Sequence, residues 1–258
     1  MSCITLTTDF GLSDPYVGIM KGVIFGSSPK TTVIDLSHKI APQNIVEGAL
    51  VIAQAYRYFP KGTVHMVVID PTVGTQRKII CVKTPSAYFL APDNGVLDYV
   101  LQEEKAFTIR EVTNRKYMLK KISHTFHGRD IFSPVAANLA KKGSVFNSLG
   151  SVVKKYVRLN VKSAVTSKKH IHGSVIYTDH FGNLITNICK GTIENHKVSG
   201  AKLGNHRISG YVKTYGESKS QKPILLMGSA GLLEVAIPSG NAAQKLGVQV
   251  GEKIRVDI

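Results

Sequence analysis

The chain has 258 residues, 43% of them hydrophobic and 19% charged, which excludes extended disorder and leaves room for two modest domains. No apolar run reaches the roughly 18 residues that a membrane helix needs. The formal net charge is +16, but the lysines are scattered, without a run of five like charges or interleaved aromatic residues, so the sequence favours a solvated basic surface over a nucleic-acid interface.

The N-terminal half alternates β-prone runs with stretches of helical spacing. Strands are predicted over residues 2–8, 31–36 and 63–69, an antiparallel strand pair over 77–84 and 87–91, and helices over 16–25, 44–56, 96–104 and 131–139. Asn44 is a suitable cap for the second of these helices. The alternation predicts an α/β N-terminal domain with a mainly parallel sheet over residues 1–160.

The pattern changes after a lysine-rich stretch near residues 143–169. Short β-like runs separated by Gly and Asn follow at 172–178, 184–188, 197–202, 207–212, 223–227, 232–236 and 252–258, with one helical turn near 241–246. This pattern is typical of a small β-barrel or sandwich. The sequence therefore predicts a smaller all-β barrel C-terminal domain over residues 170–258.

Residues 67–77, with the sequence VVIDPTVGTQR, carry the main site hypothesis. A buried strand ends at Asp70-Pro71, a glycine-containing turn follows, and Arg77 comes next. Ligands of open α/β sheets bind at the carboxyl ends of strands. We therefore expect Asp70 and Arg77, together with His127, to hold and activate a water molecule. Further acidic residues follow predicted strands at Asp9, Asp93 and Asp179.

A metal site is the alternative for these residues. Asp9, Asp70 and His127 offer ligands that suit a divalent cation, and the HxH at 170–172 would share one face of a strand. Arg77 would oppose a cation beside Asp70, so we expect no metal.

The cysteines and the N-terminal residues indicate in which cellular compartment the protein resides. Cys3, Cys81 and Cys189 are widely spaced and form no CxxC, which argues against a disulfide framework or a zinc site. The N-terminal residues lack a basic, apolar secretion signal. We expect buried thiols in a cytoplasmic protein.

Six segments, in order, resemble one family: TTDFG at 7–11, IDPTVGTQR at 69–77, APDNGVL at 91–97, FHGRDIF at 126–132, DHFGNLITNI at 179–188 and GNAA at 240–243. The family is that of the S-adenosyl-L-methionine (SAM) hydrolases that form adenosine, also called SAM hydroxide adenosyltransferases. The halide-using fluorinase and chlorinase are its relatives.

This resemblance implies a homotrimer in which SAM, as substrate and without a cofactor, lies between the N-terminal domain of one subunit and the C-terminal domain of its neighbour. Water or hydroxide would attack ribose C5′, methionine would leave and adenosine would form. Asp70, Arg77 and His127 match the water-activating set of the hydrolases. The long N-domain insertion of the fluorinase has no counterpart between Ile80 and Asn94, which favours water over halide.

The resemblance also implies substrate-binding positions. Asp9 would accept hydrogen bonds from the ribose diol, which suits a carboxylate. The ring of Phe181 would stack on adenine, and the amide of Asn183 would read the edge of the base. The remaining positions, which match contacts to the methionine portion or to adenine, are Asp14, Asp179, Ser229, Ala242 and Ala243.

The sequence leaves three alternatives to SAM hydrolysis. These are a halide-dependent SAM halogenase, a SAM- or adenosine-binding protein without turnover, and an RNA-associated module built on the C-terminal barrel. Which of Asp70, Arg77 and His127 takes the proton of the water also stays open.

Overall fold

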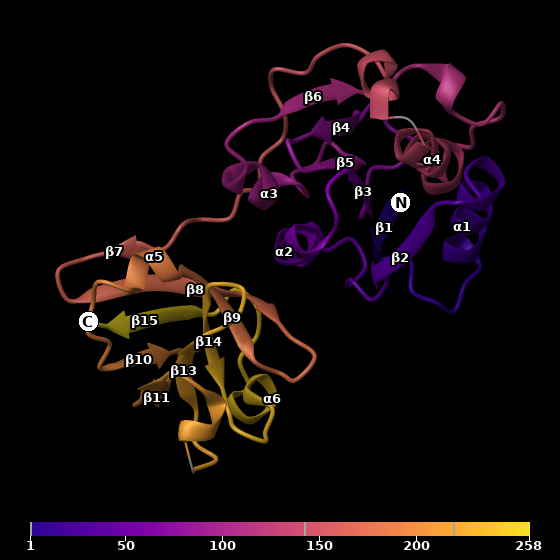
Figure 1. Ribbon diagram of the computed structural model, residues 1–258. Coiled ribbons are helices and arrows are strands. Elements are labelled where there is room, and N and C mark those ends of the chain that lie inside the picture. Colours follow the sequence, from indigo (N-terminus) through magenta and orange to yellow (C-terminus); the bar gives the residue numbers. More distant parts are fainter. Residues whose placement is uncertain (1, 142, 219) are drawn as a thin grey trace. The chain divides into compact units, whose positions relative to one another are not determined.

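The computed structural model describes residues 2–141, 143–218 and 220–258 (Figure 1). The chain divides into two compact units, Met1–Leu159 and Asn160–Ile258. The N-terminal unit is built on a six-stranded sheet, and the C-terminal unit on a nine-stranded sheet.

The sheet of the N-terminal unit has the strand order β2-β1-β3-β5-β4-β6. The pairs β2-β1, β1-β3 and β3-β5 are parallel, whereas β4 is antiparallel to both of its neighbours. The strands are β1 (Cys3–Thr8), β2 (Thr32–Ser37), β3 (Thr63–Val68), β4 (Ile79–Lys83), β5 (Ala87–Pro92) and β6 (Thr108–Glu111).

The sheet is therefore mixed: three of its five ladders are parallel, in keeping with the prediction of a mainly parallel sheet, and two are antiparallel. The reversal comes from the tight turn after β4, where the Thr84 amide donates a hydrogen bond to the Ala87 carbonyl (2.9 Å). This hairpin was predicted. Strand β6 was not, and its pairing with β4 adds the second antiparallel ladder.

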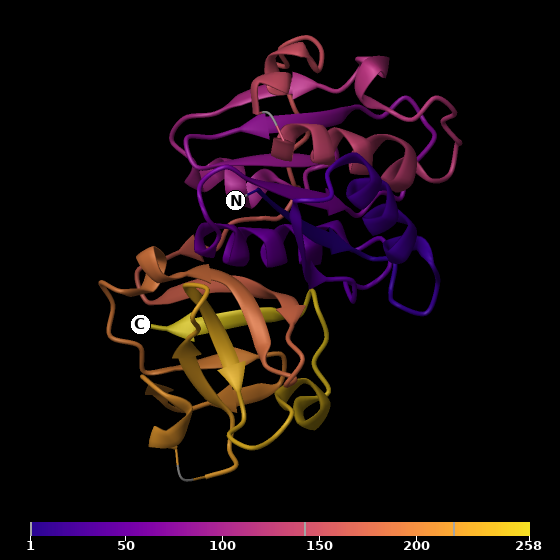
Figure 2. The same cartoon turned by 45° about the vertical axis from the view of Figure 1, so that its right-hand side comes forward.

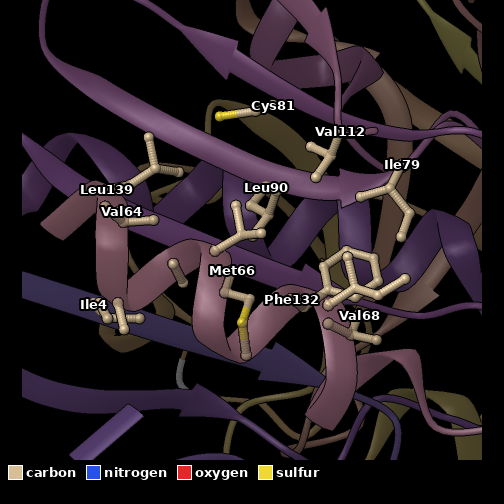
Figure 3. Close-up of a cluster of buried hydrophobic side chains, with 14 of the residues drawn as sticks. Ile4, Val64, Met66, Val68, Ile79, Cys81, Leu90, Val112, Phe132 and Leu139 are labelled. Atoms are coloured by element: carbon tan, nitrogen blue, oxygen red, sulfur yellow. The ribbon is translucent and has the colours of Figure 1, made fainter. Parts of the chain in front are cut away.

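Helices cover both faces of this sheet. Helices α1 (Tyr16–Ser27) and α4 (Ser133–Lys141) pack on one face, and α2 (Ile45–Ala55) and α3 (Asp98–Glu103) on the other. Met66 and Val68 of β3 belong to the first core cluster (Figure 3), and Val67 and Ile69 to the second. Because β3 is buried on both sides, its residues are apolar on both faces, except for the buried Thr63 and His65.

The parallel strands β1, β3 and β5 bring three acidic residues to one edge of the sheet. Their carboxyl ends lie side by side, and each is followed by an aspartate: Asp9, Asp70 and Asp93. Strand β4 runs the other way, so it begins at this same edge, just after Arg77. The register alone therefore places Asp70 and Arg77 together.

The sheet of the C-terminal unit follows the path β11-β10-β15-β8-β9-β14-β13-β12, with β7 added beside β8. Figure 2 shows the sheet curling on itself. Most of its buried apolar side chains form one core cluster. Its strands are β7 (Val165–Thr166), β8 (His170–Thr178), β9 (Leu184–Cys189), β10 (Gly200–Leu203), β11 (His206–Ile208), β12 (Tyr211–Val212), β13 (Ile224–Met227), β14 (Leu232–Ala236) and β15 (Lys253–Asp257).

This unit is a curled half-barrel, so the predicted all-β barrel is confirmed only in part. The end strands β11 and β12 are separated in sequence by Ser209 and Gly210 alone, yet no ladder joins them within the described residues. Two short helices, α5 (Lys190–Ile193) and α6 (Ala242–Leu246), interrupt the strands. The Asn241 side chain caps α6 by accepting a hydrogen bond from the Gln244 amide (2.8 Å).

Throughout the residues that the structure describes, every helix is too short or too polar to cross a bilayer.

One buried histidine in the N-terminal unit makes folding depend on pH. His65 of β3 is fully buried, stacks on Phe89, and lies with Nδ1 2.7 Å from the Thr5 hydroxyl oxygen. Burial lowers the pKa of His65 from 6.5 to about 4. The folded state thus prefers the neutral ring, so its contribution to stability is complete above pH 6.5 and is lost as the pH falls toward 4.

We expect the free energy of unfolding of the wild type to fall more steeply than that of His65→Gln between pH 6.5 and pH 4. The slopes of unfolding free energy against pH should differ by up to about 1.4 kcal/mol per pH unit, because the wild type binds one extra proton on unfolding. Urea titrations at several pH values measure it. Glu47 and Glu103, whose pKa values burial raises, act in the opposite direction in both proteins and cancel in the comparison. Parallel slopes would contradict this role for His65.

Candidate active site

Asp70, Arg77 and His127 form a continuous hydrogen-bonded chain at the carboxyl edge of the sheet. Arg77 donates to both carboxylate oxygens of Asp70, from Nε to Oδ1 (3.1 Å) and Oδ2 (2.8 Å) and from Nη2 to Oδ2 (2.6 Å). The same Nη2 lies 2.7 Å from His127 Nδ1. The structure thus brings together the three residues that the sequence analysis proposed for water activation.

The donor chemistry of arginine assigns the tautomer of His127. A guanidinium carries only N–H donors, so His127 Nδ1 must accept the hydrogen bond from Arg77, and the ring proton lies on Nε2. Burial of the ring and then the positive charge of Arg77 lower the pKa of His127, against the opposing charge of Asp70. The imidazole is neutral near pH 7, and the lone pair on Nδ1 accepts the hydrogen bond from Arg77.

The ion pair between Asp70 and Arg77 is shielded from water. The side chains retain 4% and 9% of their exposure, respectively. A charge-assisted pair with two parallel hydrogen bonds is strong and geometrically specific in such surroundings. Asp70 therefore fixes the plane of the guanidinium, and the guanidinium in turn fixes the imidazole.

The loop that carries His127 is anchored by a buried carboxylate. Asp130 Oδ2 accepts hydrogen bonds from both the amide and the hydroxyl of Ser123 (2.8 Å each), and Oδ1 accepts from Arg129 Nε (2.6 Å). Burial would raise the pKa of Asp130, but Arg129 and Ser123 together lower it. His127 then leads into a π-helical turn, Gly128–Phe132, a geometry often found at functional sites.

Asp9, the predicted ribose ligand, lies in the loop after β1. Its Oδ2 accepts a hydrogen bond from the Gln43 amide (2.8 Å), and Gln43 has a left-handed backbone with φ of 65°. The neighbouring Thr8 hydroxyl oxygen lies 2.8 Å from His38 Nδ1, and His38 Nε2 lies 3.0 Å from Asp35 Oδ1. Thr8 is fully buried, so this Thr-His-Asp chain cannot offer a nucleophile, and it braces the loop.

Two other aspartates of the N-terminal unit differ in their surroundings. Asp14 is exposed just before α1. Asp93 accepts a hydrogen bond from the Val157 amide (2.9 Å). This bond anchors the segment at the end of the N-terminal unit, so the role of Asp93 is structural.

In the C-terminal unit, Asp179, Phe181 and Asn183 share one turn between β8 and β9. Asp179 Oδ1 accepts from the amides of Phe181 (2.9 Å) and Asn183 (2.8 Å), and Oδ2 accepts from Asn183 Nδ2 (2.8 Å). Asn183 is buried, whereas the ring of Phe181 is 74% exposed. Asp179 thus organises the turn that presents an open aromatic ring.

Of the other predicted positions in the C-terminal unit, Ser229 lies away from this turn, whereas Ala242 and Ala243 lie beside it. Ser229 is exposed in the loop before β14, and the turn at 179–183 lies at the far end of that strand, about 13 Å away at 3.3 Å per residue. The side chain of Ala242 is buried in the core, which leaves its backbone for any ligand. The Ala243 amide donates to the Gly182 carbonyl (2.9 Å), so α6 buttresses the turn.

The sequence analysis did not identify Glu234, a buried acid of β14 that lies between the loop of Ser229 and the turn at 179–183. Glu234 of β14 is 7% exposed and accepts a hydrogen bond from the Tyr215 hydroxyl (2.9 Å). Its pKa is raised, mainly by burial, with Tyr215 opposing and the charge of Asp179 adding to the rise. The only signal in the sequence was one acid inside the apolar run LLEVA.

No group of three or more His, Cys, Asp or Glu side chains among the described residues is arranged to hold a metal ion. His170 and His172 do share a face of β8, with ring centroids 6.0 Å apart. Asp70, one of the candidate metal ligands, is already paired with Arg77.

Comparisons with known proteins cover nearly the whole chain. An (R)-S-adenosyl-L-methionine hydrolase of Methanocaldococcus jannaschii is 37% identical over 99% of this chain and 96% of its own length. One of Thermus thermophilus is 34% identical over 99% and 100%. A fluorinase of Actinopolyspora mzabensis is more distant, with 25% identity over 98% and 96%.

A solved structure is similar as well. The crystal structure of a conserved protein from Thermotoga maritima matches with a TM-score of 0.92 and 37% identity, covering 98% of this chain and 99% of that one. Residues 4–150 match the family model of the SAM hydroxide adenosyltransferase N-terminal domain, and residues 173–255 match that of its C-terminal domain. With both models matched in order and full-length relatives above 30% identity, the chain belongs to the SAM hydroxide adenosyltransferase family.

Proposed function

We propose that this protein hydrolyses SAM to adenosine and L-methionine. The observation that carries the proposal is the chain of Asp70, Arg77 and His127 at the carboxyl edge of the sheet, in a member of a family whose similar relatives are named SAM hydrolases. In the reaction, the oxygen of water forms a bond to ribose C5′ as the C5′–S bond breaks. The sulfur keeps the bonding pair, and one proton is released.

A sulfonium is a good leaving group, so the protein has to supply a positioned nucleophile and no acid for the departing methionine. Positioning alone can contribute up to roughly 7–11 kcal/mol. In our proposal, Arg77 favours hydroxide character in the attacking water through its charge, and the Nε2–H of His127 orients the water oxygen. Asp70 keeps the guanidinium in place.

The tautomer limits what His127 can do as a base. Its Nδ1 lone pair accepts from Arg77. To take a proton from water, the ring must first give up that hydrogen bond. We therefore assign His127 an orienting role during attack, with the proton of the product oxygen released to solvent.

We also propose that substrate sites are completed by different subunits of a homotrimer, as the family resemblance implies. Asp9 and Asp14 would bind from one N-terminal unit, and the turn of Asp179, Phe181 and Asn183 from the C-terminal unit of a neighbour. The 74% exposure of the Phe181 ring supports this, because a purine stacked on it would cover an aromatic face that its own unit leaves open.

The test is to incubate the purified full-length protein with SAM in buffer free of halide and to separate the products by liquid chromatography. We expect adenosine and methionine in equal amounts. Adding chloride or fluoride should produce no 5′-halogenated adenosine. A product that requires halide would support the halogenase alternative, and bound SAM without any product would support a sensor.

A further inference from the structure

Four basic residues form one straight row across the C-terminal sheet. The strand register pairs Arg207 of β11 with Lys202 of β10, Lys202 with Arg255 of β15, and Arg255 with His172 of β8. With neighbouring strands about 4.8 Å apart, the row is roughly 14 Å long. Lys253, two positions before Arg255, points to the same face of the sheet.

This face is open, and it is hollowed beside the row. Arg207, Lys202, Lys253 and His172 are exposed, whereas the residues next to them in sequence, such as Ala201 and Val256, are buried in the core. A hollow of about 260 Å³ is lined by His172, Lys202, Lys253 and Arg255, together with Gly173, Gly204, Glu252 and Ile254.

Acidic groups balance only part of this charge. Asp257 accepts a hydrogen bond from Arg255 Nε (3.1 Å) and lies 3.5 Å from His170 Nε2, and Glu252 lines the hollow. Lys202, Arg207 and Lys253 have no ion-pair partner among the described residues. Like charges directly opposite each other destabilise a sheet, so an arrangement of this kind is better explained by a bound anion than by stability.

The row is separate from the predicted substrate positions of the same unit. His172 lies near the start of β8, and Asp179 follows its last residue, Thr178. Six residues of strand span about 20 Å. An anion on the row would therefore leave the turn of Asp179, Phe181 and Asn183 untouched.

We propose that this basic row binds the phosphate backbone of a nucleic acid. A line of cations at regular spacing fits a linear polyanion whose phosphates follow each other along a strand. Gly204 presents no side chain beside Glu252 in the hollow, so a backbone can approach the sheet closely there. Apart from the imidazole of His172 the row contains no ring to stack on bases, and its cations would contact phosphates, which carry no sequence information, so binding should be independent of sequence.

The strand register also explains why charge scattered along the sequence can still form an interface. Lys202, Arg207, Arg255 and His172 are up to 83 positions apart (255 minus 172), and no two of them are adjacent in the chain. Pairing of β11, β10, β15 and β8 gathers them. A search for runs of like charge cannot detect such a row.

The test compares two triple variants of the full-length protein by fluorescence anisotropy with a labelled 20-nucleotide oligouridylate over a range of KCl concentrations. Lys202→Gln/Arg207→Gln/Lys253→Gln removes three charges from the row. Lys30→Gln/Lys61→Gln/Lys141→Gln removes three charges that line a hollow of the N-terminal unit. Arg255 is kept because it pairs with Asp257.

We expect the row variant to bind at least about tenfold more weakly, with the slope of log K against log[KCl] shallower by about 2, since each single-strand phosphate contact contributes about 0.7. The control variant should bind like the wild type, and both variants should keep the rate of SAM hydrolysis. The row variant should unfold at the same temperature as the wild type or a higher one, because opposed like charges have been removed from the sheet. Equal losses in the two variants, or none in the row variant, would overturn the proposal. So would binding to phosphatidylserine vesicles without binding to the oligonucleotide.

Discussion

Arg77→Lys is expected to lower kcat for SAM hydrolysis by about 10²–10³-fold while changing the dissociation constant of SAM little. Lysine keeps the positive charge but cannot donate in parallel to Asp70 and at the same time hold His127. The imidazole would lose the donor that fixes its tautomer. Because the group acts on the nucleophile, the loss should fall on turnover and not on substrate binding.

The matched control is Arg57→Lys. Arg57 also forms an ion pair, with Glu103 (2.9 Å), but its side chain is 58% exposed. A surface pair of that kind contributes little to stability, so kcat and the unfolding temperature should both stay near the wild-type values. Single-turnover kinetics with calorimetry of SAM binding separates the two effects in each variant.

A double-mutant cycle between Arg77 and His127 tests the role of Arg77 in a second way. If Arg77 acts through the imidazole as well as on the water, Arg77→Lys and His127→Gln should be far from additive in the double variant. Additive losses would mean that the 2.7 Å contact between Nη2 and Nδ1 has no part in the reaction. A raised KM with unchanged kcat in Arg77→Lys would reject the water-activating role altogether.

The parts of this site that could be predicted are those that a simple rule of sheet geometry places. Asp9 and Asp70 each follow a parallel strand, and such strands end at the same edge, so their proximity follows from the alternation of strands and helices. His127 comes from a loop that no periodicity describes. Its place was predicted from the resemblance of the segment FHGRDIF to the family motif.

Other features depend on tertiary contacts that leave little trace in the sequence. Gln43 adopts a left-handed backbone although it is not a glycine, and its amide holds Asp9. The side chain of Ala242 is buried, which the motif GNAA does not reveal. The tautomer of His127 depends on a hydrogen bond to a residue 50 positions away. The contacts of Gln43 with Asp9 and of Arg77 with His127 join residues that are distant along the chain.

Gly74→Ala is expected to damage both stability and turnover, because this glycine is where the two loops of the site meet. Gly74 lies between Asp70 and Arg77 with φ of +81°, and a Cβ at this position would overlap the carbonyl oxygen of His124, three residues before His127. The left-handed backbone costs an alanine about 1–2 kcal/mol. The backbone overlap adds about 1–3 kcal/mol, unless the loops separate.

Gly62→Ala is the control that isolates the first of these terms. Gly62 has φ of +88°, but nothing lies within 4 Å of the place that the methyl group of an alanine would occupy. The variant should lose about 1–2 kcal/mol of unfolding free energy and keep its kcat. Urea denaturation and steady-state kinetics on both variants test the difference under conditions where each is folded.

The comparison distinguishes a local strain from a coupling between loops. If the loop of Arg77 and the loop of His127 must be in contact to hold the hydrogen bond between those residues, Gly74→Ala should lose turnover well beyond its loss of folded protein. If Gly74→Ala and Gly62→Ala lose the same stability and neither loses kcat, the contact at His124 does not position the site. In that case the ion pair with Asp70 must suffice to place Arg77 against the imidazole.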